Sequence, residues 1–230
     1  MREIDRLMVE EFHITLIQMM ENAGRNLASL ARSRFFDGNP LDKNVVILAG
    51  SGGNGAGGMV CARFLHNWGA NVRVVITKPF SQLLGVPKHQ LDILRRMNIT
   101  IIVSDEDLEL KGSFDLIIDS IIGYSLKGAP KGEPARLIRW VNKQTIPVLA
   151  LDVPSGIDST TGTVYDPAIQ ATATMTLALP KEGLKAETAI PYVGALYLAD
   201  ICVPPELYTR IPISLKIGFL FVKETIIKLD

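Results

Sequence analysis

Short, almost entirely apolar runs alternate along the chain with segments whose apolar residues recur every three or four positions. The apolar runs are Asn44–Ala49, Val72–Thr77, Ile99–Val103, Phe114–Ile118 and Ile146–Leu151. Runs of this length are typical of strands buried on both faces. The periodic segments are Met59–Trp68, Lys88–Met97 and Pro134–Asn142, and each predicts a helix. This alternation predicts an α/β fold: a Rossmann-like three-layer αβα sandwich with a mostly parallel central sheet.

The two ends of the chain follow other patterns. In the first forty residues the apolar positions have helical spacing without any β-rich run, which predicts two helices packed on the sheet. After Ala171 the strand-like runs are Thr172–Leu179, Ala195–Cys202 and Ile217–Val222, with no convincing helix between them. We therefore expect a mixed or antiparallel edge at the C-terminal end. Because the sequence has neither a linker nor a repeat, a single domain over residues 1–230 is expected.

Composition and charge exclude several classes of function. The 24 basic and 24 acidic residues cancel, so the chain lacks the excess charge of a protein dedicated to nucleic acid or to an anionic membrane. No apolar stretch approaches the ~20 residues that a membrane-spanning helix needs. The segment Met1–Phe12 lacks the apolar core of a secretory signal, which favours a cytoplasmic location.

Three predicted strands run directly into loops that contain glycine. These loops are Gly50–Gly58, Asp119–Gly128 and Asp152–Gly156. Parallel strands place their carboxyl ends at one edge of the sheet, and open α/β sheets bind ligands at that edge. The three loops should therefore meet at one pocket.

The first loop has six glycines in nine positions and precedes a predicted helix. Such a loop can hold a phosphate against free backbone amides at the helix start, although it also suits a tight strand-to-helix connection. It is neither a Walker loop nor a GxGxxG followed by an acidic residue at the end of the next strand, because Thr77 and Lys78 occupy that place. An ordinary NAD dehydrogenase is therefore disfavoured.

The other two loops supply titratable and neutral oxygen groups. Asp119 and Asp152 each stand where an apolar strand ends, so one can coordinate a cation while the other acts as an acid or base; each can also simply cap a turn. Asn54 and Ser155 add neutral oxygens, a set that suits a hard cation. Lys127 lies in a glycine-flanked loop where its ammonium can meet a phosphate or donate a proton. No histidine or cysteine pattern supports a hydrolytic triad or a zinc site.

These residues belong to a series of ordered motifs that covers nearly the whole chain. The motifs are Met20–Arg25, the glycine loop followed by Val60–Arg63, Ile118–Gly123, Leu151–Gly156, Pro180–Leu184 and Gly194–Leu196. In these motifs the chain resembles the YjeF N-terminal domain family, whose enzymes are NAD(P)H-hydrate epimerases. No second half resembling the fused dehydratase of many relatives is found, so the stand-alone form is expected.

The resemblance implies an isomerase for metabolite repair, which equilibrates the R and S forms of NADH and NADPH hydrated at C6 of the nicotinamide ring (NADHX and NADPHX). It also implies a homodimer and one potassium ion per subunit, held by Asn54, Asp119 and Ser155. Asp152 and Lys127 are the expected catalytic residues. The implied substrate-binding residues are Gly53, Asn54, Gly55, Ala56, Gly57, Gly123, Tyr124, Ser125, Leu126, Lys127, Gly128, Ala129 and Asp152.

The glycine loop departs from the family pattern, which usually reads Gly-Asn-Asn-Gly-Gly-Asp-Gly. Gly53 replaces an asparagine and Gly57 replaces the aspartate. The lost carboxylate is an acceptor suited to a ribose hydroxyl or to the neighbouring loops. Two alternatives therefore stay open beside the epimerase: a non-catalytic nucleotide-binding or scaffold module of the same fold, and an enzyme acting on another nucleotide-linked metabolite.

Overall fold

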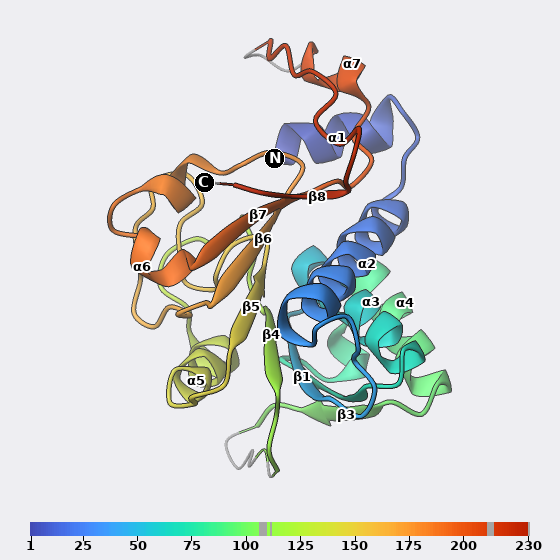
Figure 1. The fold of residues 1–230 in the computed structure, drawn as a ribbon, viewed down its shortest axis with the longest axis vertical. Coiled ribbons are helices and arrows are strands. Elements are labelled where there is room, and N and C mark those ends of the chain that lie inside the picture. Colours follow the sequence, from blue (N-terminus) through green and yellow to red (C-terminus); the bar gives the residue numbers. More distant parts are fainter. Residues whose placement is uncertain (106–109, 111, 211–213, 230) are drawn as a thin grey trace.

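The computed structural model describes residues 1–105, 110, 112–210 and 214–229, and its described strands form one sheet of eight (Figure 1). The strands are β1 (Asn44–Ala49), β2 (Asn71–Ile76), β3 (Thr100–Val103), β4 (Leu116–Ser120), β5 (Val148–Leu151), β6 (Ala173–Leu177), β7 (Ala195–Ala199) and β8 (Ile226–Lys228). Their order across the sheet is β3-β2-β1-β4-β5-β6-β7-β8. Over the first six strands this is the order of a doubly wound Rossmann fold, in which the strand order reverses between β1 and β4.

Strands β1 to β7 are parallel and only the pairing of β7 with β8 is antiparallel. The predicted parallel sheet with a mixed C-terminal edge is therefore confirmed. The predicted strand Ile217–Val222 is wrong, because this segment is irregular and the last strand lies further on, at β8. An apolar run does not form a strand unless a neighbouring strand can hydrogen-bond with its backbone.

The helices cover both faces of the sheet and one of its ends. They are α1 (Arg2–Glu10), α2 (Leu16–Phe35), α3 (Gly53–Asn67), α4 (Gly85–Arg96), α5 (Gly132–Val141), α6 (Ile190–Val193) and α7 (Pro205–Tyr208), with short 3₁₀ turns at Phe80–Gln82 and Glu182–Lys185. Figure 1 shows α2, α3 and α4 on one side of the sheet, α5 and α6 on the other, and α1 across its end near α7. Short helices thus occur after Ala171, where none was expected.

Alternate residues of the central strands enter two separate cores. Val45 and Ile47 of β1 pack with α2 and α3, whereas Val46 and Leu48 pack with α5. Successive side chains of a strand point to opposite faces, so a strand covered on both faces must be apolar at every position. This explains why the sequence predicted these strands so well.

Helix α3 begins six residues earlier than the predicted Met59, so most of the predicted glycine loop is its first two turns. The helix approaches β4 closely at Gly58, where a Cβ atom would lie 1.9 Å from Ser120 Oγ. Close packing between α3 and β4 therefore requires a glycine at that position. Helical periodicity could not reveal this start, because a glycine-rich turn carries no apolar side chains.

Within the described ranges no helix is long and apolar enough to cross a membrane.

Candidate active site

A cavity of about 620 Å³ lies at the carboxyl ends of β1, β4 and β5. Its walls include Gly50–Asn54 after β1, Ile121–Ser125 after β4 and Asp152 after β5. The predicted meeting of three loops at one pocket is thus confirmed. The cavity spans the point at which the strand order reverses, where Rossmann folds bind their ligands.

Asp152 is held at the cavity by a three-residue turn at the end of β5. Its φ is +67°, and Val153 N donates to Leu151 O at 2.9 Å, which closes the turn. Asp152 N donates to Met175 O of β6 at 2.7 Å. Left-handed backbone is costly outside glycine, although aspartate tolerates it better than most residues. Both sheet and turn therefore direct this carboxyl group to one place.

A second turn of the same kind brings a cation to Asp152. Ala178, directly after β6, has a φ of +61°, and Leu179 N donates to Leu177 O at 2.7 Å. The chain then returns so that Lys181 Nζ lies 2.5 Å from Asp152 Oδ1 as an ion pair, while its hydrogen bond goes to Leu177 O at 2.7 Å. The side chains of Lys181 and Asp152 are 5% and 4% exposed. A buried lysine is uncommon unless it has such a partner.

Lys181 was not among the predicted catalytic residues, although it stands in the Pro180–Leu184 motif. The sequence signal was present, but nothing in its spacing from Asp152 reveals that two turns fold these residues together. Lys127, the predicted lysine, has an exposed side chain and is not among the residues that line the cavity.

Asp119 and Ser155 form a buried hydrogen-bonded pair, and neither is among the residues that line the cavity. Asp119, on β4, is 0% exposed. Its Oδ1 accepts from Ser155 Oγ at 2.6 Å and from Ile121 N at 3.2 Å, and its Oδ2 accepts from Ser155 N at 2.8 Å. Burial raises the pKa of Asp119 to about 6, while the hydrogen bonds from Ser155 and Ile121 oppose that rise. A positive charge placed here would stabilise the ionised carboxylate.

The predicted cation ligands fit an alkali cation by their chemistry. Asp119 contributes a carboxylate, Ser155 a hydroxyl, and Asn54 an amide at the start of α3. Asn54 Nδ2 is buried without a hydrogen-bond partner, so this N–H group can donate to an acceptor, while the amide oxygen Oδ1 is the atom that a cation would contact. Among the described residues no group of three or more His, Cys, Asp and Glu side chains gathers as a metal site. One carboxylate with neutral oxygens suits a hard cation of low charge.

Gly123 separates the two polar groups that face the cavity. A Cβ atom at this position would lie 3.1 Å from Asn54 Oδ1 and 3.3 Å from Asp152 Oδ2. The next residue, Tyr124, donates its backbone N–H to Asp152 Oδ2 at 3.2 Å. The loop after β4 thus passes closely between the α3 start and Asp152, and glycine leaves room for that passage.

The remaining predicted substrate-binding residues fall into two groups. Gly53, Asn54, Gly123, Tyr124, Ser125 and Asp152 line the cavity. Gly55, Ala56 and Gly57 are buried within the first turns of α3, while Leu126, Lys127, Gly128 and Ala129 lie in the loop beyond the lining residues. The contacts of both groups with a substrate stay a prediction.

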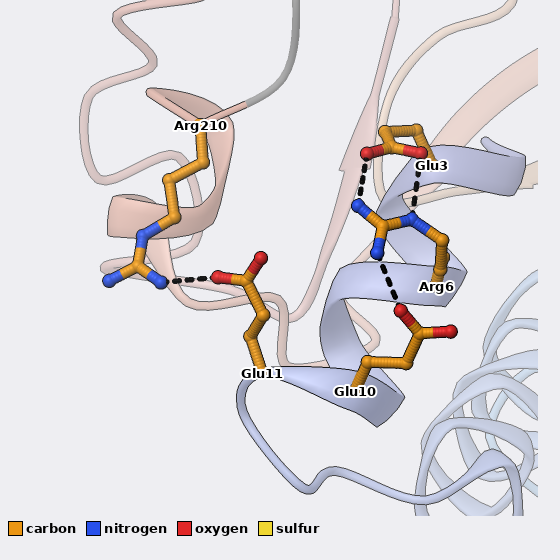
Figure 2. A network of polar contacts seen from close by, with 5 residues as sticks. All are labelled: Glu3, Arg6, Glu10, Glu11 and Arg210. Atoms are coloured by element: carbon orange, nitrogen blue, oxygen red, sulfur yellow. Dashed lines mark hydrogen bonds and ion pairs between the residues drawn. The ribbon is translucent and has the colours of Figure 1, made fainter.

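Helix α1 forms a wall of the cavity that the sequence did not reveal. Tyr124 Oη donates to Asp5 Oδ2 at 2.5 Å, and both residues line the cavity. Burial raises the pKa of Asp5, and the hydrogen bond from Tyr124 opposes this. The outer face of α1 carries exposed ion pairs: Figure 2 shows Arg6 between Glu3 and Glu10, and Glu11 bound to Arg210 after α7.

Comparison with known proteins finds a family model and several relatives that match this chain. The model of a family described as YjeF-related protein N-terminus matches residues 16–183. The NAD(P)H-hydrate epimerase of Dehalogenimonas lykanthroporepellens is 42% identical over 212 residues, which cover 91% of this chain and 82% of that protein. The NAD(P)H-hydrate epimerase of Lentilactobacillus buchneri is 32% identical, with 87% of this chain and 90% of that protein covered.

Longer relatives and a solved structure agree with this match. The bifunctional NAD(P)H-hydrate repair enzyme Nnr of Moorella thermoacetica is 36% identical over 213 residues, which span 90% of this chain but only 40% of that protein. The crystal structure of the yeast protein ynu0 superposes with a TM-score of 0.80 at 26% identity, covering 99% of this chain and 96% of that one.

Proposed function

The chain belongs to the family of YjeF-related protein N-termini, and on that premise we propose that it is an isomerase of metabolite repair that interconverts the R and S epimers of hydrated NADH and NADPH. The names of its relatives at 42% and 32% identity support this activity. The observation in this chain that carries the proposal is the buried ion pair between Asp152, which lines the cavity, and Lys181, which contacts Asp152 without lining the cavity itself.

The reaction needs an acid and a base beside one carbon atom. The hydrate carries its hydroxyl on C6, next to the ring nitrogen. Protonation of that hydroxyl lets it leave as water while the nitrogen lone pair forms a C=N double bond. Water then adds to the opposite face and gives up a proton, so the atoms balance and only the configuration changes. Positioned proton transfer of this kind contributes about 10²–10⁴ in rate.

In the proposed mechanism Asp152, which lines the cavity, exchanges protons with the substrate, and Lys181 acts through its ion pair with Asp152. The ammonium of Lys181 is a proton donor and the carboxylate of Asp152 an acceptor, and they lie 2.5 Å apart away from bulk water. A low-dielectric setting strengthens their effect on a developing charge. Tyr124 N holds Asp152 Oδ2, so the carboxylate keeps its orientation through the reaction.

The cation belongs to the same proposal. Asn54, Asp119 and Ser155 would hold a potassium ion in each subunit, and its positive charge would compensate the buried charge of Asp119. Asn54 would also turn a polar atom toward the substrate, because it lies at the helix start that faces the cavity. A homodimer and a cytoplasmic location complete the proposal.

Matched variants of the ion pair test this function. Asp152→Asn and Lys181→Met are each compared with wild type for the rate at which one pure epimer of NADPHX becomes the other, with potassium present. We expect both rates to fall by about 10²–10⁴. The controls are Lys185→Gln, an exposed lysine in the 3₁₀ turn that follows Lys181, and Asp166→Asn, whose side chain is 94% exposed.

Both control variants should keep the wild-type rate. Circular dichroism must show that Asp152→Asn and Lys181→Met are folded, and Lys181→Arg keeps the charge and should recover part of the activity. Full activity in folded Asp152→Asn would refute the assigned mechanism.

A further inference from the structure

The far end of the cavity from Asp152 carries a basic residue. Strand β2 ends at Ile76, and the next two residues, Thr77 and Lys78, line the same cavity as the glycine turn after β1. Thr77 N donates to Ala49 O at 3.1 Å, which holds this segment against the end of β1. The side chain of Lys78 is exposed, so its ammonium is available to a ligand.

No acidic side chain is bound to Lys78 in the described part of the chain. The carboxylate of Glu133 adjoins Pro134, another lining residue, but it is paired with Arg136 and accepts from Ser104 Oγ at 2.5 Å. In Rossmann folds that bind NAD, the end of this strand usually carries an acidic residue that accepts from the ribose 2′-hydroxyl. A lysine there has the opposite preference and attracts a phosphate.

The two ends of the cavity differ in unpaired charge. Asp152 and Asp5 line one end, where Asp152 is paired with Lys181 and Asp5 accepts from Tyr124 Oη, whereas Lys78 at the other end has no acidic partner among the described residues. Strands β1 and β4 stand between β2 and β5, and three strand spacings of ~4.8 Å put the strand ends ~14 Å apart. A dinucleotide bound across the reversal point between β1 and β4 therefore has one nucleoside near Asp152 and the other near Lys78. The more anionic nucleoside is favoured at Lys78.

We propose that Lys78, helped by the hydroxyl groups of Thr77 and Ser51, binds the 2′-phosphate of the adenosine ribose and makes the protein prefer hydrated NADPH to hydrated NADH. This inference rests on the proposed function and adds its substrate preference. Thr77 and Ser51 both line this end of the cavity, and a hydroxyl donates to a phosphate oxygen as readily as to a hydroxyl oxygen. Nothing in this recognition depends on the reacting ring.

Binding of two nucleotide fragments tests the preference without any turnover. Isothermal titration with adenosine 2′,5′-bisphosphate and with 5′-ADP compares ligands of similar size, of which only the first has a 2′-phosphate. We expect wild type to bind the first about tenfold more tightly, as one charged hydrogen bond allows. Lys78→Gln should abolish the difference, and Lys78→Glu should reverse it. Lys88→Gln, which removes an exposed lysine of α4, should keep the tenfold difference between the two ligands.

Equal affinities in wild type, or an unchanged ratio in Lys78→Glu, would overturn the inference. The KM for NADPHX and NADHX is measured with the same variants. If the fragment ratio responds to Lys78 but no variant epimerises either hydrate, the binding inference stands and the proposed function fails. If epimerisation is rapid but both hydrates and both fragments are treated alike, the function stands and the role of Lys78 fails.

Discussion

The residues of the site differ in how far the sequence could reveal them. Asp119 and Asp152 were predicted because each ends an apolar run, and a carboxylate there must be buried at the ligand edge of the sheet. Lys181 was not predicted as a site residue, because its ion pair with Asp152 depends on two turns with positive φ, at Asp152 and Ala178. The periodicity of the sequence does not reveal such turns. Asp5 was not predicted to line the cavity, because a charged residue on an amphipathic helix is usually exposed to solvent.

Asp119 should make the stability of the protein depend on pH. Its pKa is about 6 when folded against an ordinary 3.8, so between these values the folded state binds more protons than the unfolded state. Stability therefore falls as the pH rises from about 4 to about 6, by up to about 3 kcal/mol, and then stays constant as far as this group is concerned. Urea denaturation in a potassium-free buffer measures this fall.

The Asp119→Asn variant is the control for that pH dependence, since its amide does not titrate. The difference in unfolding free energy between wild type and variant should change over this pH range in the stated direction. Added potassium should reduce the loss in wild type alone, because a bound cation favours the ionised carboxylate. A parallel pH profile for both proteins would show that Asp119 is not the titrating group.

The Asp152–Lys181 ion pair should also contribute to the free energy of unfolding. Lys181→Met leaves the Asp152 carboxylate buried without its cation, which costs about 3–5 kcal/mol when one partner of a buried pair is removed. The double variant Asp152→Asn, Lys181→Met removes both charges and should recover much of that loss. Chemical denaturation of the two single variants and the double variant gives the coupling, and additive losses would contradict the pairing.

At the scale of elements, close approach explains the glycines better than phosphate binding alone. The predicted glycine loop is mostly the start of α3. At Gly57 and Gly58 this helix lies so near β5 and β4 that a Cβ atom would clash with a side chain of the strand. A Cβ atom at Gly57 would lie 2.8 Å from Leu151 Cδ2, the mobile end of a residue that lines the cavity. The departure from the family aspartate at this position is thus accompanied by the leucine side chain occupying the adjoining space.

Two alanine substitutions in α3 separate packing from helix propensity. In Gly58→Ala the new methyl would lie 1.9 Å from Ser120 Oγ, so the variant should lose about 1–3 kcal/mol through overpacking. In Gly53→Ala the nearest atom is Met20 Sδ at 3.8 Å, so the variant should be unchanged or slightly more stable. Thermal unfolding of both variants measures the contrast, and equal stabilities would argue against the close packing of α3 on β4.

Helix α1 is held by its apolar face more than by the ion pairs of Figure 2. Ile4, Leu7 and Met8 are at most 2% exposed and pack with α7, whereas Glu11 and Arg210 are 39% and 52% exposed in their side chains. Leu7→Ala should therefore weaken the packing of α1 and the Asp5–Tyr124 contact. The KM for NADPHX should rise as a result. Removing an exposed ion pair costs at most about 1 kcal/mol, so Glu11→Gln should change neither.

Hydrogen exchange of the α1 amides and the KM for NADPHX measure this difference. Rapid exchange in Leu7→Ala with an unchanged KM would show that α1 is not needed as a wall of the cavity.

At the scale of the whole molecule, the sequence predicted the architecture from one regularity. Apolar strands alternate with amphipathic helices from β1 to β3 and again from β4 to β5, although β3 lies at the edge of the sheet and is partly exposed, and that alternation leaves few topologies. The C-terminal part was less predictable, since β8 has only three residues and pairs with β7 from a distant segment. The order β3-β2-β1-β4-β5 then brings the three predicted loops to one cavity, which is why the site could be located before its partners were known.

The most direct test of the central claim follows both epimers of NADPHX by NMR, each started pure with the purified protein and potassium. An epimerase accelerates the approach to one common R to S ratio from either side, with the total amount of hydrate constant. We expect this convergence to run well above the spontaneous rate. Convergence no faster than without protein, from a folded chain that binds adenosine 2′,5′-bisphosphate, would contradict this expectation.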